Sequence, residues 1–536
     1  MKEYLLFIPL FLLLCMNSAP ASAYDGPLYD SSAYTDCKLE VEDPLYNGGM
    51  LKDQEPAIEL VILGDSDRVN VLVFSLQNLT QGTKYCFSIW IRIKYADSSL
   101  IKASLVTEER TLNCIGTVTA KAGCWSFLKG GFASTSPLKM PKLYLQPFTD
   151  EEWRLNQETK INKARKRAVT IHVSDKQGMK LQGAAVRIEQ ISKDFPFGSA
   201  IAKTIIGNSQ YQKWFVERFN AAVFENELKW NATEPNPGQV NYTIPDQMLE
   251  FIRSNQIIVR GHNIFWEDPK FIPGWVRNLT GHDLESAVQS RIESLMKKYK
   301  EEFIHWDVNN EMLHFGFYED RLGPNATLQF FNTAHQADPL ATLFMNEFNV
   351  VETCSDINST VDTYVSRMRE LQRGGVSMNG IGLQGHFDVP NTPLMRGIID
   401  KLATLGLPIW LTEVDISKQF GKETQAMHLE EVLREGFSHT AVDGIILWTA
   451  LRKNGCYQMC LTDDEFNNLP AGDTVDRLLR EWQTGVADGE TDEYGSYSFF
   501  GFLGEYKVTA KLGNVAVNST FSLSQGKETK HFNIQL

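Results

Sequence analysis

The sequence predicts an α/β protein built on a (β/α)8 TIM barrel, with a β-sandwich before the barrel and a small β-rich region after it. Three observations predict this fold. Apolar runs alternate with helix-period segments from about residue 195 onward, short β-rich runs precede them, and polar residues follow the ends of the apolar runs. A chain of 536 residues exceeds what one hydrophobic core usually organises, so several domains are expected.

Eight apolar runs are the expected barrel strands. They read FPFGSAI, AAVFENELKW, QIIVRGHNIFW, FIHWDVNNE, ATLFMNEFN, GIGLQGHF, LPIWLTEVDI and DGIILWTAL. Segments of helical periodicity lie between them, such as LESAVQSRIESLMKKYKEE and VDTYVSRMRELQRG. Eight strands of near-continuous apolar character over roughly 250 residues match a closed parallel barrel. A doubly wound sheet is the less economical alternative, because it seldom needs eight such units.

The regions on either side of the barrel are expected to form β-sandwiches. Short β-rich runs such as NVLVFSL and KYCFSIWIRIKY, broken by turn residues, predict a sandwich within residues 24–160. Residues 486–536 also alternate polar with aromatic or β-branched residues. They echo the pattern of residues 168–190, so we expect these two stretches to share a sheet, with the barrel of the 165–485 domain inserted between them.

The N-terminus reads as a signal for export. Lys2 is followed by an apolar run and then by a small-residue pattern ending at Ala23, which predicts a signal peptide of residues 1–23 and a secreted protein without membrane attachment. Asn-x-Ser/Thr sequons fit export. They begin at Asn78, Asn231, Asn241, Asn278, Asn325, Asn358 and Asn518.

Charge narrows the class of partner. The formal net charge of −14 disfavours nucleic acid and anionic membranes, so the expected partner is uncharged. In an oxidising compartment some cysteines should pair, and the pairs that are close in sequence are Cys114 with Cys124 and Cys456 with Cys460. The connectivity stays open, although the seven cysteines left after signal removal leave at least one unpaired within the chain.

Polar and aromatic residues follow seven successive strands, at the face where barrels of this kind carry their active sites. Each alone has a structural explanation, but their gathering at one face predicts a site. They are Glu225, Asn226 and Lys229, then His262 and Trp266, then Asn310 and Glu311, then Asn346 and Glu347, then Gln384 and His386, then Glu413 and Asp415, and finally Trp448.

The motifs HWDVNNE, WLTEVDI, FENELKW, RGHNIFW and GIGLQGHF, in this order, resemble glycoside hydrolase family 10, whose members are mostly endo-1,4-β-xylanases. GCYQMCLTD and CWSFLKGGF are similar to segments of its plant members. The resemblance covers roughly residues 165–485 and implies a secreted enzyme that cuts internal bonds of cell-wall xylan. The region before it is similar to a family 22 carbohydrate-binding module.

The resemblance implies that Glu311 is the acid/base and Glu413 the nucleophile of a retaining mechanism. Such a mechanism needs two carboxyl groups about 5 Å apart, and a closed barrel can bring two distant strands that close. The acid must keep its proton near neutral pH, which a buried surround or a second carboxylate can achieve. No metal or other cofactor is required, and we expect a monomer.

The other site residues are implied to hold sugar. Asn310 would bond the 2-hydroxyl of the sugar, His386 would orient Glu413 with Asp415 behind it, and the tryptophans would offer flat faces to pyranose rings. Asn346 and Glu347 are expected to support the mouth. The remaining expected sugar contacts are Glu225, Asn226, Lys229, His262 and Gln384.

Three departures from the family pattern concern the substrate contacts. Position 267 is Glu where a second His is usual, position 309 is Asn where Val is common, and the segment after Trp448 lacks a further Trp. Two alternatives to hydrolysis remain at this point. A sugar hydroxyl could intercept the intermediate, giving a xylan endotransglycosylase, or the chain could be a wall-binding glycoprotein without catalysis.

Overall fold

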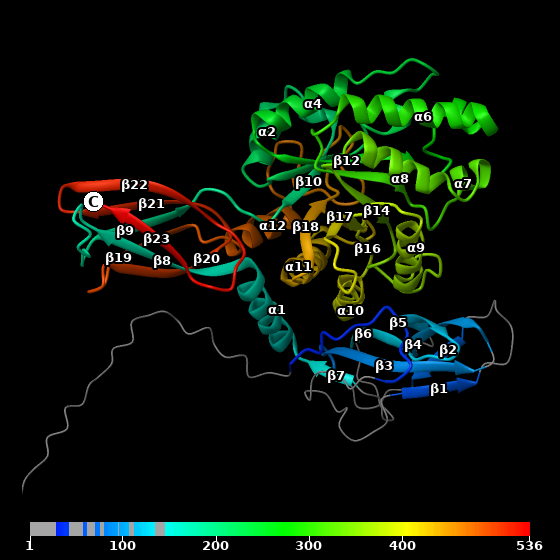
Figure 1. The fold of residues 1–536 in the computed structure, drawn as a ribbon, viewed down its shortest axis with the longest axis horizontal. Helices are drawn as coiled ribbons and strands as arrows, with labels where there is room; N and C mark the ends of the chain where they lie inside the picture. The colour runs from blue at the N-terminus through cyan, green and yellow to red at the C-terminus, as the bar shows by residue number, and fades with distance from the viewer. Residues whose placement is uncertain are drawn as a thin grey trace, which may run out of the picture.

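A computed structural model describes residues 28–41, 57–61, 70–74, 80–94, 96–106, 112–134 and 145–536. The expected signal peptide and the sequon at Asn78 lie outside these residues. Figure 1 shows three parts, namely an N-terminal β-sandwich, a barrel surrounded by helices and a C-terminal β-sandwich.

The central part is a closed parallel barrel. Its strands follow the order β15-β14-β13-β12-β11-β10-β18-β17, and β15 pairs with β17 to close the ring. This confirms the predicted (β/α)8 fold. The strands are β10 (Phe197–Ile201), β11 (Ala221–Phe224), β12 (Ile258–Trp266), β13 (His305–Asn310), β14 (Thr342–Glu347), β15 (Gly380–Leu383), β17 (Ile409–Ile416) and β18 (Val442–Leu447), with the short β16 (His386–Phe387) beside β17.

Helices cover the outside of the barrel (Figure 1). They are α2 (Ser209–Val216), α3 (Trp230–Thr233), α4 (Thr243–Ser254), α5 (Gly274–Arg277), α6 (Gly281–Lys298), α7 (Phe317–Leu322), α8 (Ala326–Ala337), α9 (Val361–Arg373), α10 (Thr392–Ala403), α11 (Lys422–Ser438) and α12 (Pro470–Glu481), with a 3-10 turn, η2 (Lys203–Ile205). Side-chain caps start several of them, since Thr360 accepts from Thr363 N and Asn391 from Leu394 N. Within the described chain, no helix combines the length and the apolar character that a membrane crossing needs.

The N-terminal part is a sandwich of two sheets. One holds β1 (Ala57–Val61), β3 (Lys84–Lys94), β6 (Ser126–Ala133) and β7 (Leu145–Phe148), and the other holds β2 (Asn70–Phe74), β4 (Ser98–Val106) and β5 (Leu112–Lys121). Residues of both sheets form a common apolar core that includes Ile91, Ile101 and Leu128. Helix α1 (Asp150–Arg165) leads from this sandwich to the next strand.

The C-terminal sandwich combines two distant stretches of the chain. Strand β8 (Lys166–Ser174) pairs with β20 (Ser496–Phe502) and β23 (Lys530–Gln535). Strand β9 (Ala185–Gln190) pairs with β19 (Val486–Glu490) and β21 (Gly504–Leu512), and β21 pairs with β22 (Val515–Leu523). The barrel is therefore inserted in this sandwich, as expected. Residues 166–190 belong to the sandwich, so the barrel itself begins with β10 and not at residue 165.

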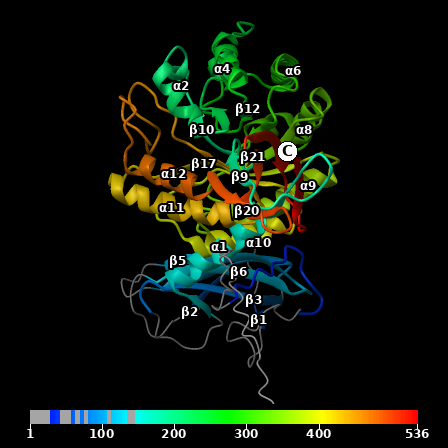
Figure 2. The same cartoon turned by 90° about the vertical axis from the view of Figure 1, so that its left-hand side faces the viewer.

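The N-terminal sandwich packs directly against the barrel, beside α10 in Figure 2. A Cβ added at Gly131 in β6 would lie 2.6 Å from Cβ of Pro393 in α10, so only glycine permits this close approach. Lys129 of β6 forms a buried ion pair with Asp400 of α10 at 2.8 Å. This contact between the domains is both apolar and ionic.

The disulfides correct one expectation. Cys114 pairs with Cys354, and Cys124 pairs with Cys37, so the expected Cys114–Cys124 bond is wrong. Cys114 lies in β5 and meets the barrel loop after β14, which the spacing of cysteines within the sandwich could not reveal. The expected Cys456–Cys460 bond is present, and Cys86 is free and buried.

Candidate active site

The polar residues expected at the strand ends lie together at one mouth of the barrel. Strand β13 ends at Asn310, and Glu311 follows with a φ of 62°, a left-handed conformation that is uncommon outside glycine and often marks a functional site. Glu413 lies within β17, between Thr412 and Val414. Both glutamates are nearly enclosed, with 7% of Glu311 and 5% of Glu413 exposed.

Gln384 and Asn346 link the two glutamates. The side chain of Gln384 donates from Nε2 to Glu311 Oε1 at 3.1 Å, while its backbone carbonyl accepts from the backbone N of Glu413 at 2.7 Å. Asn346 Nδ2 donates to Glu413 Oε1 at 2.8 Å and to Asn310 Oδ1 at 2.9 Å. The barrel therefore brings strands far apart in sequence to one polar cluster. Asn346, expected only to support the mouth, contacts Glu413 itself.

The surroundings shift the pKa values of the two carboxyl groups in opposite directions. Burial raises the pKa of Glu311 to about 7, and the charges of Glu347 and Glu413 act in the same direction. Burial also disfavours the charged form of Glu413, but His262 and the contact with His386 outweigh it. Together with the charge of Lys229 they lower the pKa of Glu413 to about 2. Near neutral pH Glu311 can therefore hold a proton, while Glu413 is ionised.

His386 lies between two carboxylates. Its Nδ1 is 2.9 Å from Asp415 Oδ1 and its Nε2 is 3.5 Å from Glu413 Oε2. Burial lowers the pKa of His386, but Asp415 and Glu413 outweigh it and raise that pKa well above its usual value. A cationic His386 favours the ionised form of Glu413, and Asp415 contacts the opposite side of the ring.

A second row of polar groups extends away from the carboxylates. Arg452 Nη2 donates to Glu225 Oε1 at 2.6 Å, and Asn226 Nδ2 donates to Glu225 Oε2 at 3.0 Å. Lys229 Nζ in turn donates to Asn226 Oδ1 at 2.9 Å and lies 4.6 Å from the ring centroid of Trp266. This row forms one wall of the site.

Aromatic rings complete the site. The ring of His262 packs edge-on to Trp448 with centroids 5.3 Å apart, and its Nδ1 is 2.9 Å from Asp307 Oδ2. One face of Trp266 is covered by Phe271, stacked at 3.8 Å. Asn310 Nδ2 is buried and has no hydrogen-bond partner among the described residues, so it is a donor available to a bound molecule.

Comparison with known proteins identifies the family. The sequence profile of glycosyl hydrolase family 10 matches residues 188–475, which is more than half of the 536 residues. The chain belongs to this family. As a family 10 protein it is a glycoside hydrolase, as predicted from its strand-end motifs.

Similar proteins include two from Arabidopsis thaliana. Endo-1,4-beta-xylanase 5-like is 36% identical, with 84% of this chain and 83% of the relative covered. Endo-1,4-beta-xylanase 4 is 34% identical, with 97% and 96% covered. Among solved structures, xylanase 10B from Thermotoga petrophila RKU-1 in complex with xylobiose is 25% identical, with a TM-score of 0.48, covering 54% of this chain and 94% of that one.

Two departures of this family 10 enzyme from the expected pattern contact each other. Asn309 Nδ2 donates to Glu267 Oε1 at 2.7 Å, and the backbone N of Tyr318 donates to Glu267 Oε2 at 3.0 Å. Glu267 and Asn309 are 1% and 0% exposed, and burial raises the pKa of Glu267 to about 7. Glu267, directly after β12, therefore contacts both Asn309 of β13 and the backbone of Tyr318 in α7.

Three further residues near the site were not predicted from the sequence. Arg452 follows β18 and pairs with Glu225, and the basic run RKNG after the last strand could have indicated it. Tyr457, 47% exposed, packs edge-on to His386 with centroids 5.5 Å apart. Glu352 Oε1 accepts from the backbone N of Gly385 at 2.9 Å and of His386 at 3.1 Å, and nothing in its local sequence indicated that contact.

Proposed function

We propose that this glycoside hydrolase is a secreted, retaining endo-1,4-β-xylanase that acts as a monomer on cell-wall xylan. The observation that carries the mechanism is the pair Glu311 and Glu413, joined through Asn346 and Gln384 and shifted in pKa to about 7 and about 2. The names of the Arabidopsis relatives support xylan as the substrate.

In the first step Glu311 donates its proton to the glycosidic oxygen while the Glu413 carboxylate attacks the anomeric carbon. The bond to the leaving sugar breaks, and an ester forms between the remaining sugar and Glu413. Asn310 Nδ2 is the proposed donor to the 2-hydroxyl, because it is buried and otherwise unpaired in the described chain. A hydrogen bond at this position strengthens as the oxocarbenium-like transition state develops.

In the second step Glu311 acts as a base. The charge of Glu413 helps to raise the pKa of Glu311, and that charge is absent while Glu413 is esterified. Glu311, already deprotonated, then keeps a lower pKa and takes a proton from the attacking water. Hydrolysis of the ester restores both groups and the original anomeric configuration.

The location and the N-terminal sandwich are part of the proposal. Export rests on the signal-like residues 1–23 and on the sequons, whose described asparagines, Asn231, Asn241, Asn278, Asn325, Asn358 and Asn518, are all exposed. The N-terminal sandwich is proposed to be a family 22-like carbohydrate-binding module that is fixed to the barrel and not carried on a flexible linker, since Cys114–Cys354 and Lys129–Asp400 join the two.

The direct test is release of reducing sugar from xylan by the mature protein. Glu311→Ala and Glu413→Ala should each lower kcat at least about 100-fold, since each removes a group that acts in the transition state. Azide should partly restore activity to Glu413→Ala, because a small anion can enter the space left by the carboxylate. Tight retention on xylan without release of sugar would contradict the proposal, and exchange of chain lengths without new reducing ends would indicate transfer to a sugar.

A further inference from the structure

A pocket of about 570 Å³ opens beside the candidate active site and takes no part in the proposed reaction. It lies between η2, the start of α4 and the turn after β18. Its polar lining comprises Lys203, Thr204, Asn226, Glu227, Asn241, Arg452, Lys453 and Asn454. Its volume falls within the range of small-molecule sites in proteins.

The charge of this pocket is opposite to that of the whole chain. Three of its lining residues are basic and one is acidic, in a protein with a formal net charge of −14. The acidic residue, Glu227, is already engaged, since its two oxygens accept from Lys203 N at 2.8 Å and Asn226 N at 3.1 Å. Lys203 and Lys453 are exposed, and neither forms an ion pair within the described part of the chain.

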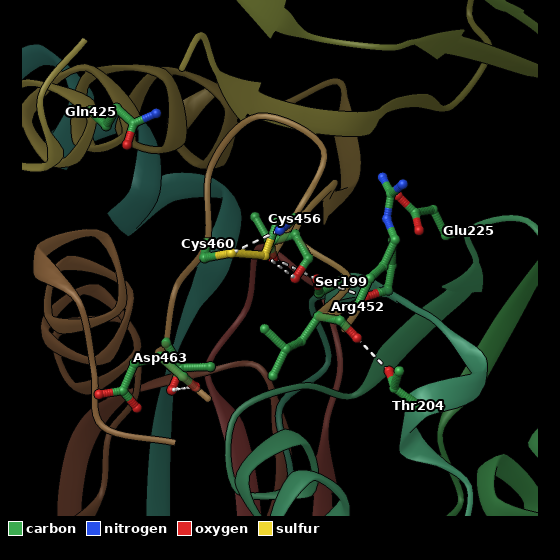
Figure 3. The surroundings of a disulfide bond; sticks show 12 residues. Ser199, Thr204, Glu225, Gln425, Arg452, Cys456, Cys460 and Asp463 are labelled. Carbon is green, nitrogen blue, oxygen red and sulfur yellow. Dashed lines mark hydrogen bonds and ion pairs between the residues drawn. A yellow bond between two sulfur atoms is a disulfide. The ribbon is translucent and has the colours of Figure 1, made fainter. Parts of the chain in front are cut away.

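The basic wall of the pocket is held in place by local structure. Gly455 N donates to Arg452 O at 3.2 Å and Gly455 has a φ of 87°, which closes a tight turn. The Cys456–Cys460 disulfide follows this turn, and Thr204 Oγ1 donates to Leu451 O before it. Figure 3 shows the disulfide, Arg452 and Thr204 close together. The backbone that carries Arg452 and Lys453 is therefore held by contacts within the chain itself.

The pocket shares a wall with the proposed substrate cleft. Asn226 lines the pocket and also accepts from Lys229 in the site. Arg452 lines the pocket while one of its nitrogens donates to Glu225, beside which it lies in Figure 3. A side group on a polysaccharide held along Glu225 and Asn226 is next to this pocket, since Asn226 lines it together with Lys203 and Lys453.

We propose that this pocket binds an acidic sugar branch, a uronic acid attached to the polysaccharide backbone, through the carboxylate of that branch. The inference rests on the proposed function. Two ammonium groups and the free edge of a guanidinium match a carboxylate, and the side chains of Thr204, Asn241 and Asn454 offer hydrogen bonds to sugar hydroxyls. A neutral branch would leave the lysines without a counter-charge and would offer them only neutral hydrogen-bond acceptors.

The test compares glucuronic-acid-substituted xylan with the same polymer after reduction of its carboxyl groups to alcohols. The two polymers differ only at this group, which is a carboxylate in one and a neutral hydroxymethyl group in the other. The wild-type enzyme should show a kcat/KM roughly three- to tenfold higher on the acidic polymer, as expected for two partly exposed charge contacts. The preference should shrink as salt is raised.

The variant Lys203→Gln/Lys453→Gln should bring this ratio close to one while keeping the activity on the reduced polymer. The matched control, Lys511→Gln/Lys527→Gln, makes the same change of charge at exposed lysines of the C-terminal sandwich and should keep the wild-type ratio. A ratio that survives in the pocket variant overturns the inference. A ratio near one in the wild-type enzyme also overturns the inference. If that ratio then rises in Asn241→Gln, which removes the sequon, the pocket holds a glycan and not a uronic acid branch. Failure to hydrolyse either polymer would instead contradict the proposed function itself.

Discussion

Glu311 and Glu413 carry the same functional group, and their neighbours decide which of them holds a proton. Burial by itself would raise the pKa of both carboxyl groups. Glu413 in addition faces His262 and His386, whereas Glu311 faces the charges of Glu347 and Glu413. Burial is therefore opposed at Glu413 and reinforced at Glu311, and the proposed division of roles rests on these contacts.

The pH dependence of kcat/KM should report this division. Glu311 must be protonated, so activity should fall as pH rises through about 7. Glu413 must be ionised, so activity should be limited by this group only as pH falls toward about 2. The measurement is kcat/KM on a soluble xylan across the pH range, with the folded state followed by circular dichroism. An alkaline limb that is unchanged in a Glu311→Gln variant with residual activity would contradict the assignment.

The loop between β14 and α9 connects the N-terminal sandwich to the active site. It carries Cys354, which is bonded to Cys114, and Glu352, whose carboxylate holds the backbone of Gly385 and His386. His386 in turn contacts Glu413. The Cys114–Cys354 disulfide to the N-terminal sandwich therefore lies two residues from Glu352, whose carboxylate contacts the backbone of the active site in the barrel.

Replacement of Glu352 by alanine should lower kcat/KM several-fold, because two backbone donors lose their acceptor and His386 loses its fixed position. Leaving these two backbone donors without an acceptor should also lower the free energy of unfolding by about 1–3 kcal/mol. Glu352→Gln keeps one carbonyl acceptor and should recover part of the activity. The measurement is steady-state kinetics together with Tm.

Glu423→Ala, at an exposed glutamate in the first turn of α11, is the matched control and should behave as wild type. Wild-type kinetics of Glu352→Ala would show that the loop does not position the site.

Buried charged groups connect helix α1, which follows the N-terminal sandwich, to the barrel helices α10 and α11. Arg396 of α10 donates from Nε to Glu435 Oε1 of α11 at 2.5 Å, and both side chains are 0% exposed. Trp153 and Gln157 of α1 donate to Glu435 Oε2 at 3.0 and 2.9 Å. Helix α1 is thereby fixed to the barrel at the point where the chain leaves the N-terminal sandwich.

Arg396→Ala should destabilise the protein by about 3–5 kcal/mol, because it leaves the charge of Glu435 buried without its partner. The control is Arg187→Ala, which removes an exposed pair with Asp488 and should cost less than about 1 kcal/mol. Chemical denaturation of both variants measures the difference. Equal stability of the two would contradict the role assigned to the buried pair.

The barrel, and the gathering of polar side chains at its mouth, could be predicted from the sequence because both depend on local patterns. The strand WLTEVDI is apolar enough to be recognised as buried, and Glu413 stands out within it. The contacts between domains could not be predicted in this way. Arg396 and Glu435 lie in helices where charged residues usually face solvent, and the pairing of Cys114 with Cys354 spans 240 residues. The contact between Glu267 and Asn309 joins two residues 42 positions apart, which local patterns could not reveal either.

The most direct test of the account is to trap the sugar on the protein. A 2-deoxy-2-fluoro xylobioside with a good leaving group slows both steps and should accumulate the ester, since fluorine destabilises the oxocarbenium-like transition states. Mass spectrometry of the digested protein should then find the added sugar on the peptide that contains Glu413, and Glu413→Gln should not be labelled. A label on another residue, or hydrolysis of xylan with inversion and no label, would contradict the central claim.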